Sequence, residues 1–378
     1  GTYRKDLAIA IALFAAILKT LPEGRLPVAV GESRRRIMSE PRGAHRPPTI
    51  RDVAARAGVA LSSVSRALSG HPDVSATMKA RVETAARELG YEPDLLAQSL
   101  RRGSTRTVGF AMRDISNQLF ANVAKSCEQE LRRAGYTMIL TNSDGDLLTE
   151  AANLDVLRRR RIDGLIVSLV SETAERTSRT LQSMGLPIVL LDREVEGLEA
   201  SGVLCAHYAG VTEAMQALLD VGHRRIAIVL GPDDVRTARE RRRAYDDALR
   251  AAGIPHDDSL VIVGALDEVS VEKRLSVVMG RADAPTAVLA VGIPATVAAL
   301  RAGRAVGKEA GKDLAIIALD EWPFLEDFTN SIAVITRDPA VMGREAARLM
   351  LQLMDKGKPS SVTVPVMFRA NGALAPQG

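Results

Sequence analysis

The stretch that decides the fold runs from Thr49 to Leu68 and reads TIRDVAARAGVALSSVSRAL. Thr49 can cap a first short helix, and Asp52 stands three residues further on, which is the spacing of a capping box. Gly58 then ends this helix, because glycine adopts the left-handed conformation at little cost. A second short helix is predicted over Leu61–Leu68. Two short helices around a glycine turn have the layout of a helix-turn-helix.

The second helix has a polar face that can contact DNA. A third helix, capped by Ser75 and stopped by Gly90, supplies the packing partner of the first two. Small hydroxyls can bond phosphates or base edges, and an arginine can bind guanine through two hydrogen bonds. The alternative is a three-helix packing module that does not bind DNA. The outward face argues against it, because that face carries Ser62, Ser63, Ser65 and Arg66.

Positive charge gathers in the same part of the chain. The 378 residues have a formal net charge of +4, yet the segment from Arg42 to Arg106 alone holds eleven basic and six acidic residues, a surplus of five. Clustered basic residues are the electrostatic footprint of nucleic-acid binding.

The two cysteines, Cys127 and Cys205, lie in apolar or helical stretches without a CxxC pair. This pattern favours buried thiols in a reducing, cytoplasmic compartment.

The chain ahead of the helix-turn-helix is interpreted as a leader, residues 1–48, that is disordered or not native. Its apolar run Leu7–Leu18 is too short to span a bilayer. It could pass for the core of a signal peptide, but no convincing cleavage site follows. We expect residues 1–37 to be upstream sequence translated in frame, and the working protein to start near Met38.

Residues 93–105 are predicted to link the DNA-binding domain, residues 49–92, to the rest of the chain. This stretch includes a predicted helical segment that is too short to be stable alone in water. Its apolar residues are Leu95, Leu96, Ala97 and Leu100. The segment therefore needs a partner against which to fold.

Residues 106–370 are predicted to form two Rossmann-like lobes. Helix-length amphipathic stretches such as Leu119–Ala134 and Ala209–Val221 separate short apolar runs, and repeated βα units of this kind build parallel sheets covered by helices. Ligands bind at the carboxyl ends of such strands, which makes the cleft between the lobes the expected pocket. The predicted strands are Val108–Met112, Thr137–Thr141, Leu165–Leu169, Ile188–Asp192, Ile226–Leu230, Leu260–Val263, Ala287–Val291 and Leu314–Leu319.

From Thr49 to about Phe368 the sequence resembles the lactose-repressor (LacI/GalR) family of transcription regulators. The DNA-binding phrase of residues 49–69 is highly specific. Moderately specific phrases follow at Asp114-Ile-Ser-Asn117, Gly222-His-Arg-Arg-Ile226 and Thr237-Ala-Arg-Glu-Arg241. The resemblance implies an N-terminal all-α helix-turn-helix headpiece and an α/β effector domain like the periplasmic binding proteins. It also implies a homodimer that binds a near-palindromic, double-stranded operator.

The resemblance assigns residues 94–101 to a hinge helix that folds on the operator. Leu100 would then enter the minor groove beside Ala97, and an apolar wedge of this kind unstacks a base step and bends the DNA. The alternative is that Leu100 packs on the third helix. The implied DNA-binding residues are Thr49, Arg51, Leu61, Ser62, Ser63, Ser65, Arg66, Ser75, Tyr91, Ala97 and Leu100.

The resemblance also implies a site for a small, sugar-like effector between the lobes. Carboxylates and a guanidinium can bond hydroxyls in pairs, while a phenyl ring supplies an apolar face. Asp192 and Asp320 could instead cap loops, and Arg239 could belong to a solvated helix face. Trp322 could line the mouth of the cleft or simply pack. The implied effector-binding residues are Asn117, Phe120, Asp192, Arg239, Asp320 and Arg337.

The sequence departs from the family pattern at two places. Ala60 stands where a serine or threonine usually caps the recognition helix, a change worth about 1 kcal/mol, and Leu61 replaces the more common polar or aromatic base reader. Gly292 and Ile293 stand where the family typically has Asn-Asp, which removes two hydrogen-bonding side chains from a diol site. The effector therefore stays unidentified.

We interpret the protein as a repressor whose operator affinity changes with effector binding. No nucleophile–base constellation, cofactor motif or metal-ligand cluster is visible, which disfavours an enzyme. A periplasmic sugar-binding protein would share the two-lobed fold but would leave residues 49–103 unexplained. The sequence leaves open the operator, the direction of regulation, and the choice between dimer and tetramer.

Overall fold

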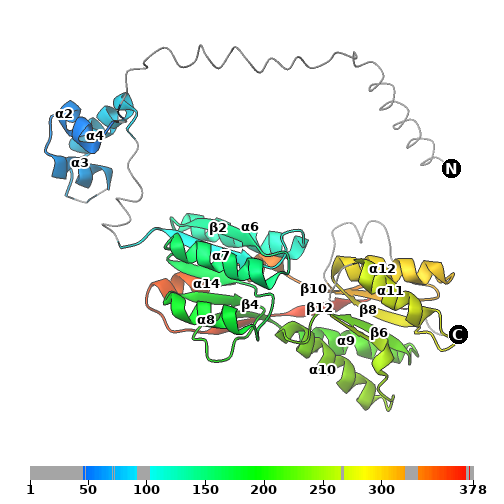
Figure 1. Ribbon diagram of the computed structural model, residues 1–378. Helices are drawn as coiled ribbons and strands as arrows, with labels where there is room; N and C mark the ends of the chain where they lie inside the picture. Colours follow the sequence, from blue (N-terminus) through cyan, green and yellow to red (C-terminus); the bar gives the residue numbers. More distant parts are fainter. Residues whose placement is uncertain are drawn as a thin grey trace, which may run out of the picture. The chain divides into compact units, whose positions relative to one another are not determined.

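The computed structural model describes residues 46, 48–69, 71, 73–91, 103–264, 268–319, 331–371 and 374. Contacts divide the chain into two compact units, Gly1–Pro93 and Asp94–Gly378. Figure 1 shows a helical unit in blue and a larger α/β unit in cyan to red. Among the described residues, none of the helices has both the length and the apolar character needed to cross a membrane.

The helical unit, called the headpiece here (residues 49–91), contains the predicted three helices. They are α2 (Ile50–Ala57), α3 (Leu61–Leu68) and α4 (Ala76–Leu89). Gly58 and Gly90 end α2 and α4 in the left-handed conformation, with φ of 61° and 64°. Small and β-branched side chains from all three helices form the core, which lets helices of only a few turns approach closely. These are Val53, Ala57, Val64, Ala67, Val82, Ala85 and Ala86.

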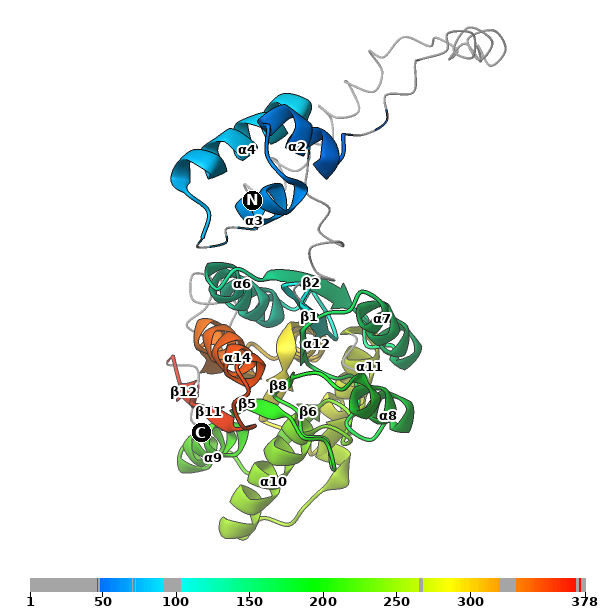
Figure 2. The ribbon, with the colours of Figure 1, turned by 90° about the vertical axis from the view of Figure 1, so that its left-hand side faces the viewer.

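The N-lobe is built on a sheet of strand order β11-β5-β4-β3-β1-β2. All of its neighbouring strands run parallel. The strands are β1 (Thr107–Met112), β2 (Thr137–Asn142), β3 (Gly164–Val167), β4 (Ile188–Leu191), β5 (Ser201–Cys205) and β11 (Ser361–Val364). Helices α6 (Gln118–Arg133) and α14 (Pro339–Met354) pack on one face, and α7 (Leu147–Arg159) and α8 (Glu175–Met184) on the other. Figure 2 shows the two pairs on opposite sides.

The C-lobe repeats this plan with the strand order β12-β10-β9-β8-β6-β7. Its strands are β6 (Ile226–Leu230), β7 (Val261–Val263), β8 (Ala287–Val291), β9 (Ala315–Leu319), β10 (Ala333–Arg337) and β12 (Val366–Arg369). Only the β10–β12 pair is antiparallel among the described strands. The helices are α9 (His207–Asp220), α10 (Arg236–Ala251), α11 (Glu268–Met279) and α12 (Gly292–Ala305), and a 3₁₀ turn spans Asp258–Leu260.

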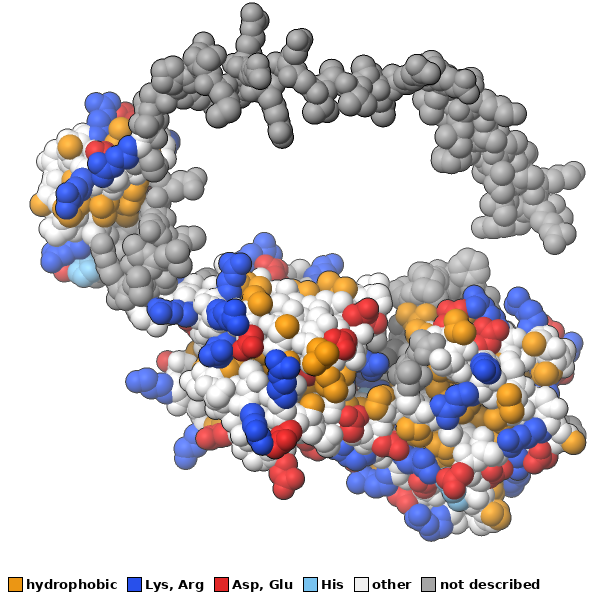
Figure 3. All heavy atoms as spheres, in the orientation of Figure 1, with side chains coloured by type: hydrophobic (Ala, Val, Ile, Leu, Met, Phe, Trp, Pro, Cys, Tyr) orange, Lys and Arg blue, Asp and Glu red, His pale blue; other side chains and the backbone are white. Residues whose placement is uncertain are grey.

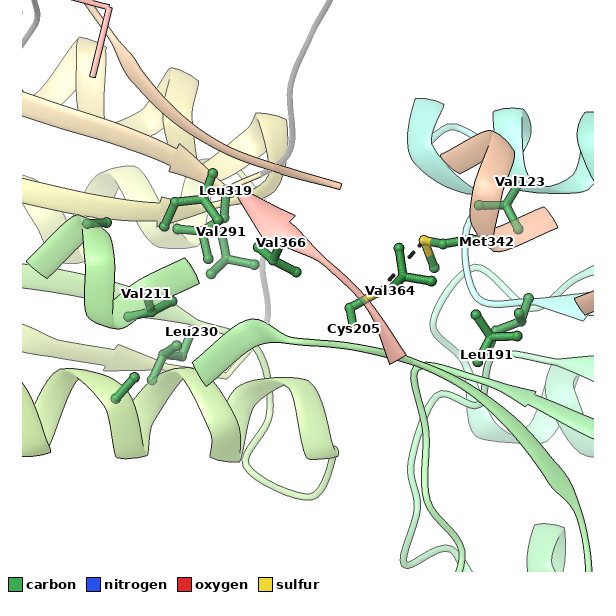
Figure 4. Close-up of a cluster of buried hydrophobic side chains, with 14 of the residues drawn as sticks. Val123, Leu191, Cys205, Val211, Leu230, Val291, Leu319, Met342, Val364 and Val366 are labelled. Carbon is green, nitrogen blue, oxygen red and sulfur yellow. Dashed lines mark hydrogen bonds between the residues drawn. The ribbon is translucent and has the colours of Figure 1, made fainter. Parts of the chain in front are cut away.

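The chain passes between the lobes at three places. It crosses from β5 to α9, from β10 to α14, and from β11 to β12 through Pro365. One continuous cluster of buried side chains extends through this region from one lobe to the other. Figure 4 shows Cys205, Val364 and Val366 at the crossovers, between Leu191 of the N-lobe and Leu319 of the C-lobe.

The predicted fold class is confirmed, and each predicted strand lies on an observed strand. Two predicted starts lie outside the observed strands: Leu260 closes the 3₁₀ turn before β7 begins at Val261, and Leu314 forms an isolated bridge with Ala310 before β9 begins at Ala315. Strands β5, β10, β11 and β12 were not anticipated. β11 and β12 are short edge strands with exposed residues, so they lack the continuous apolar runs by which the central strands were recognised.

Candidate DNA-binding surface and effector cavity

Helix α3 presents a face that the headpiece core leaves open. Val64 and Ala67 are buried against the other two helices. The spacing of 3.6 residues per turn then leaves Leu61, Ser62 and Arg66 exposed. Ser63 and Ser65 are half-buried at the flanks. The predicted outward face of the recognition helix is thus the accessible one, and Figure 3 shows Lys and Arg side chains on the visible side of the headpiece.

Two of the predicted DNA-binding residues have a structural role at helix starts. The Thr49 amide and hydroxyl both donate to the Asp52 carboxylate, at 2.7 and 2.6 Å, and these bonds lower the pKa of Asp52. Ser75 accepts from the Met78 amide at 3.3 Å and caps α4. Ala60 gives α3 no such cap, as expected from its side chain.

The other predicted DNA-binding residues differ in exposure. Arg51 is exposed, whereas Tyr91 is half-buried and packs against the headpiece core. Ala97 and Leu100 lie outside the described residues, as does Asp320 of the predicted effector site. The structure therefore supports an accessible α3 face and does not test the minor-groove wedge.

A cavity of about 460 Å³ lies between the two lobes. This volume suits a small metabolite. Asn117, Phe120, Asp192 and Arg337, four of the predicted effector-binding residues, line it. The other lining residues are Arg113, Asp114, Asp144, Gly145, Arg193, Gly231, Pro232, Val235, Thr237, Arg241, Val291, Gly292 and Pro294.

The N-lobe positions its predicted residues through the ends of its elements. Asn117 caps α6 by accepting from the Leu119 amide at 3.0 Å, which places Phe120 in the first turn of the helix beside the cavity. Asp192 follows β4 directly and adopts a left-handed conformation with φ of 55°. Such a backbone is uncommon for a non-glycine residue and is maintained by the contacts of the side chain.

Asp192 is the centre of a buried charged network where the chain crosses between lobes. Its Oδ1 accepts from the Cys205 amide at 3.0 Å, and its Oδ2 lies 2.7 Å from His207 Nε2. Arg236 Nη1 is 3.5 Å from Oδ1, and Arg337 Nη1 is 3.9 Å from Oδ2. The Asp192 side chain is 3% exposed, so its charge is compensated by neighbours rather than by water.

The network fixes the charges of its members. Burial raises the pKa of Asp192, but His207, Arg337 and the Cys205 amide outweigh burial and hold that pKa well below its usual value. Burial lowers the pKa of His207 to about 4, and the nearby Arg241 and Arg337 act in the same direction against Asp192. At neutral pH, His207 is therefore a neutral ring that donates its Nε2 proton to an ionised Asp192.

We expect the stability of the protein to fall as the pH drops from 6.5 towards 4. In this window the unfolded chain binds a proton at His207 that the folded chain does not, which costs up to about 1.4 kcal/mol per pH unit. His207→Gln should show a shallower loss than the wild type when urea unfolding is followed across these pH values. His256→Gln, at an exposed histidine, is the control and should follow the wild type. Equal slopes for wild type and His207→Gln would contradict the assignment.

Arg239 does not line the cavity in this structure, so the lining gives its predicted effector contact no support. Its guanidinium donates to Glu172 Oε2 at 2.7 Å, and the side chain is 48% exposed. Thr237 and Arg241 line the cavity instead, and Arg241 is 5% exposed. The reason is helical geometry. Thr237 and Arg241 are four residues apart and share one face of α10, whereas Arg239 is two residues from each and lies on the opposite face. The spacing of four residues between Thr237 and Arg241 could be seen in the sequence Thr237-Ala-Arg-Glu-Arg241.

Sequence reasoning missed further lining residues. Arg113 follows β1, Asp144 follows β2, and Arg193 follows Asp192 beyond β4. Because the carboxyl ends of parallel strands meet at one edge of the sheet, charged residues directly after each strand were detectable candidates.

Asp192, Cys205 and His207 also present potential metal-ligand atoms within 4.8 Å of one another. His207 already bonds to Asp192, and Cys205 Sγ lies 3.8 Å from Met342 Sδ. Two guanidinium groups reach the same carboxylate and would repel a cation. The residues therefore fit an ion-pair network better than a metal centre.

Comparison with known families agrees with this architecture. Residues 49–94 match the family described as bacterial regulatory proteins, lacI family. Residues 215–370 match the periplasmic binding protein-like domain. The first match covers the headpiece, and the second covers most of the C-lobe together with α14, β11 and β12.

Whole-chain relatives give the same result. The ribose operon repressor of Bacillus subtilis is 30% identical over 322 residues, covering 85% of this chain and 96% of the relative. A transcriptional regulator CelR–cellobiose complex has 27% identity and a TM-score of 0.64, covering 85% of this chain and 98% of the other. A lac repressor dimer bound to operator and the anti-inducer ONPF has a TM-score of 0.74 at 21% identity, covering 87% and 100%. This chain belongs to the lacI family of bacterial regulatory proteins. It is a sequence-specific, DNA-binding transcription regulator.

Proposed function

We propose that the protein is a repressor that binds double-stranded operator DNA as a homodimer in the cytosol. The exposed Leu61, Ser62 and Arg66 face of α3 reads the major groove, and residues 93–105 form the hinge. We assign residues 49–92, which include the headpiece, to the DNA-binding domain and residues 106–370 to the effector and dimerisation domain. The relative solved with operator is itself named as a dimer, which supports this assembly.

The observation that carries the regulatory part of the proposal is the interlobe cavity. A cavity lined by both lobes lets a bound effector hold them in one arrangement. Operator affinity then changes with effector binding, and by linkage the effector affinity changes with operator binding. Ribose and cellobiose appear in the names of relatives, which supports a sugar-derived effector.

The DNA-binding part is tested by duplex binding across a range of salt concentrations. The logarithm of the binding constant should fall with the logarithm of salt at a slope of several units, because phosphate contacts release counterions. A footprinted operator taken from genomic fragments supplies the specific duplex, and a scrambled duplex is its control. Absence of binding at low salt would refute the proposal.

Lobe closure is stabilised by a cross-lobe contact at Glu172. Glu172 follows β3 in the N-lobe, and its Oε1 accepts from the Arg236 amide at the start of α10 in the C-lobe, at 2.9 Å. Its Oε2 accepts from Arg239, and its own amide donates to the Asp234 carbonyl at 3.2 Å. A carboxylate at a helix N-terminus is favourable, and this one is buried.

We expect Glu172→Ala to loosen the lobes without unfolding either one. Loss of a charge-assisted hydrogen bond of about 1.5 kcal/mol should accelerate hydrogen exchange in the first turn of α10 roughly tenfold. Glu175→Ala is the control, since the Glu175–Arg179 pair lies on the surface of α8. Unchanged exchange at the start of α10 would show that Glu172 does not hold the lobes.

A further inference from the structure

A run of four arginines, Arg158–Arg161, lies where α7 ends and the chain turns into β3. All four are exposed. Arg158 pairs with Asp155 of the same helix, with 3.1 Å between Nη2 and Oδ1. For Arg159, Arg160 and Arg161, no carboxylate of the described chain lies within ion-pair distance. Three neighbouring cations are therefore open to an anionic partner.

The arginine run lies beside the point where the chain enters the N-lobe. Thr105 donates through its hydroxyl to the Arg161 carbonyl and through its amide to the Asp163 carboxylate, both at 2.9 Å. The Asp163 amide donates to the Thr107 carbonyl at 2.7 Å, and the Asp163 carboxylate also accepts from the Ser104 hydroxyl at 2.6 Å. The run is therefore fixed at the edge of the sheet where β1 and β3 begin, opposite the edge that lines the cavity.

Other basic residues lie at the same edge. Arg106 directly precedes β1 and is exposed. Lys356 and Lys358, also exposed, follow α14. This helix ends at the start of β3, where a Cβ built on Gly164 would lie 2.9 Å from Met354 Cε. The basic edge is defined here as Arg106, Arg159, Arg160, Arg161, Lys356 and Lys358.

Acidic residues do not cancel the charge of the basic edge. The turns that lead into β1, β3 and β11 are residues 103–107, 155–164 and 354–360, and they hold one, four and two basic residues against none, two and one acidic residues. Glu199, ahead of β5, adds one further acid. Two arginines at the end of α6 each pair with a glutamate of that helix and add no net charge. Figure 3 shows Lys and Arg side chains gathered at the left-hand end of the N-lobe, where the chain enters it in Figure 1.

Three residues of the basic edge stand at backbone positions that favour glycine. Arg106, Arg161 and Lys356 have left-handed φ values of 52°, 53° and 62°. The end of α8 has glycine at such a position, Gly185, with φ of 60°. Glycine adopts this conformation at lower cost than any residue with a Cβ, so the backbone does not account for the basic side chains. A cation after a helix is favourable in itself, but Arg106 precedes a strand.

We propose that the basic edge binds the phosphate backbone of the operator duplex and so adds a second DNA contact to that of the headpiece. Exposed guanidinium groups suit this partner, because they form charge-assisted hydrogen bonds with phosphate oxygens. The inference rests on the proposed operator binding and goes beyond it, since it assigns a DNA contact to the effector domain.

The connection along the chain favours duplex DNA as the partner. Tyr91 of the headpiece and Gly103 beside the basic edge are 12 residues apart, so they are separated by no more than about 42 Å. This is little more than one turn of a duplex, roughly 35 Å. A duplex carries one negative charge for about every 1.7 Å of its length. A headpiece bound to DNA therefore keeps many phosphates within the distance that the linking segment can span.

The test measures the salt dependence of DNA binding by the full-length protein, with fluorescence anisotropy as the readout. Arg159→Gln/Arg160→Gln should reduce the slope of log affinity against log salt by about 1.8 or more, because each lost phosphate contact removes about 0.9 and is lost in both protomers of the proposed dimer. At about 50 mM salt the operator affinity should fall roughly tenfold or more. The affinity for a scrambled duplex should fall by a similar factor, because phosphate contacts carry no sequence information.

Two matched variants control for charge and position. Arg159→Lys/Arg160→Lys keeps both charges and should keep the slope of the wild type. Arg176→Gln/Arg344→Gln removes the same charge from exposed arginines in the first turn of α8 and the second turn of α14, away from the basic edge. This variant should also keep the wild-type slope.

The outcomes separate this inference from the proposed function. An unchanged slope in Arg159→Gln/Arg160→Gln overturns the inference, and an accompanying fall in the thermal midpoint would mean that these arginines only stabilise the end of α7. An equal loss of slope in Arg176→Gln/Arg344→Gln overturns it as well, because general charge would then explain the effect. Failure of the wild type to bind either duplex at low salt would instead refute the regulator function itself.

Discussion

Asp192→Ala is expected to lower the free energy of unfolding by about 3–5 kcal/mol, because it leaves buried charges without their partner. The substitution removes the carboxylate that Arg236 and Arg337 face, and it leaves the Cys205 amide and His207 without an acceptor. Urea unfolding of the purified wild type and variant measures the change.

Two further variants make this expectation specific. Asp192→Asn keeps an acceptor for the Cys205 amide but no charge, so its loss should be smaller than that of alanine. Asp155→Ala removes a carboxylate on α7 that, among the described residues, pairs with Arg158 of the same helix alone, and it should cost no more than about 1 kcal/mol. A loss at Asp192→Ala no larger than at Asp155→Ala would mean that the network does not stabilise the fold.

Arg66→Ala is expected to weaken operator binding roughly 5- to 150-fold for each half-site, the equivalent of about 1–3 kcal/mol for each lost bidentate base contact. Arg66 is exposed on α3, and among the described residues no carboxylate pairs with it. Its removal should therefore leave the headpiece folded and the effector affinity unchanged. Fluorescence anisotropy with operator and scrambled duplexes separates lost specificity from lost phosphate binding.

The matched variant is Arg87→Ala, at an exposed arginine in the last turn of α4. It changes the headpiece charge by the same amount but leaves the α3 face intact, so it should affect both duplexes equally and weakly. If Arg66→Ala and Arg87→Ala weaken operator binding by the same factor, Arg66 contributes only general charge.

The sequence predicted the elements of the fold better than the residues of the site. Apolar periodicity and the glycine turn identified the headpiece and the central strands, because these features depend on local burial and backbone conformation. The polar edge strands depend on pairing between distant segments. Strand β11 (Ser361–Val364) pairs with β5 (Ser201–Cys205), and no local sequence pattern predicts this pairing.

The effector residues show the same limit. Asn117 and Asp192 were predicted from the family resemblance, and both line the cavity. Arg239 was chosen over Arg241 although the two differ by half a helical turn, and only the orientation of α10 decides which of them meets the cavity. The lining residues Arg113, Arg193 and Arg241 were also not predicted, since they come from separate elements of both lobes.

The crossings of the chain between lobes have a consequence for biosynthesis. The headpiece is one continuous segment and can fold as soon as it leaves the ribosome. The N-lobe sheet, in contrast, lacks its edge strand and the helix α14 until residues 339–364 have been made, although its first strand begins at Thr107. A premature stop codon before residue 339 would remove α14 and leave only α6 on that face of the sheet, so part of its apolar surface would be exposed to water. Such an allele would yield a folded headpiece without a folded effector domain. Late nonsense mutations should therefore abolish regulation by the effector and leave the headpiece folded.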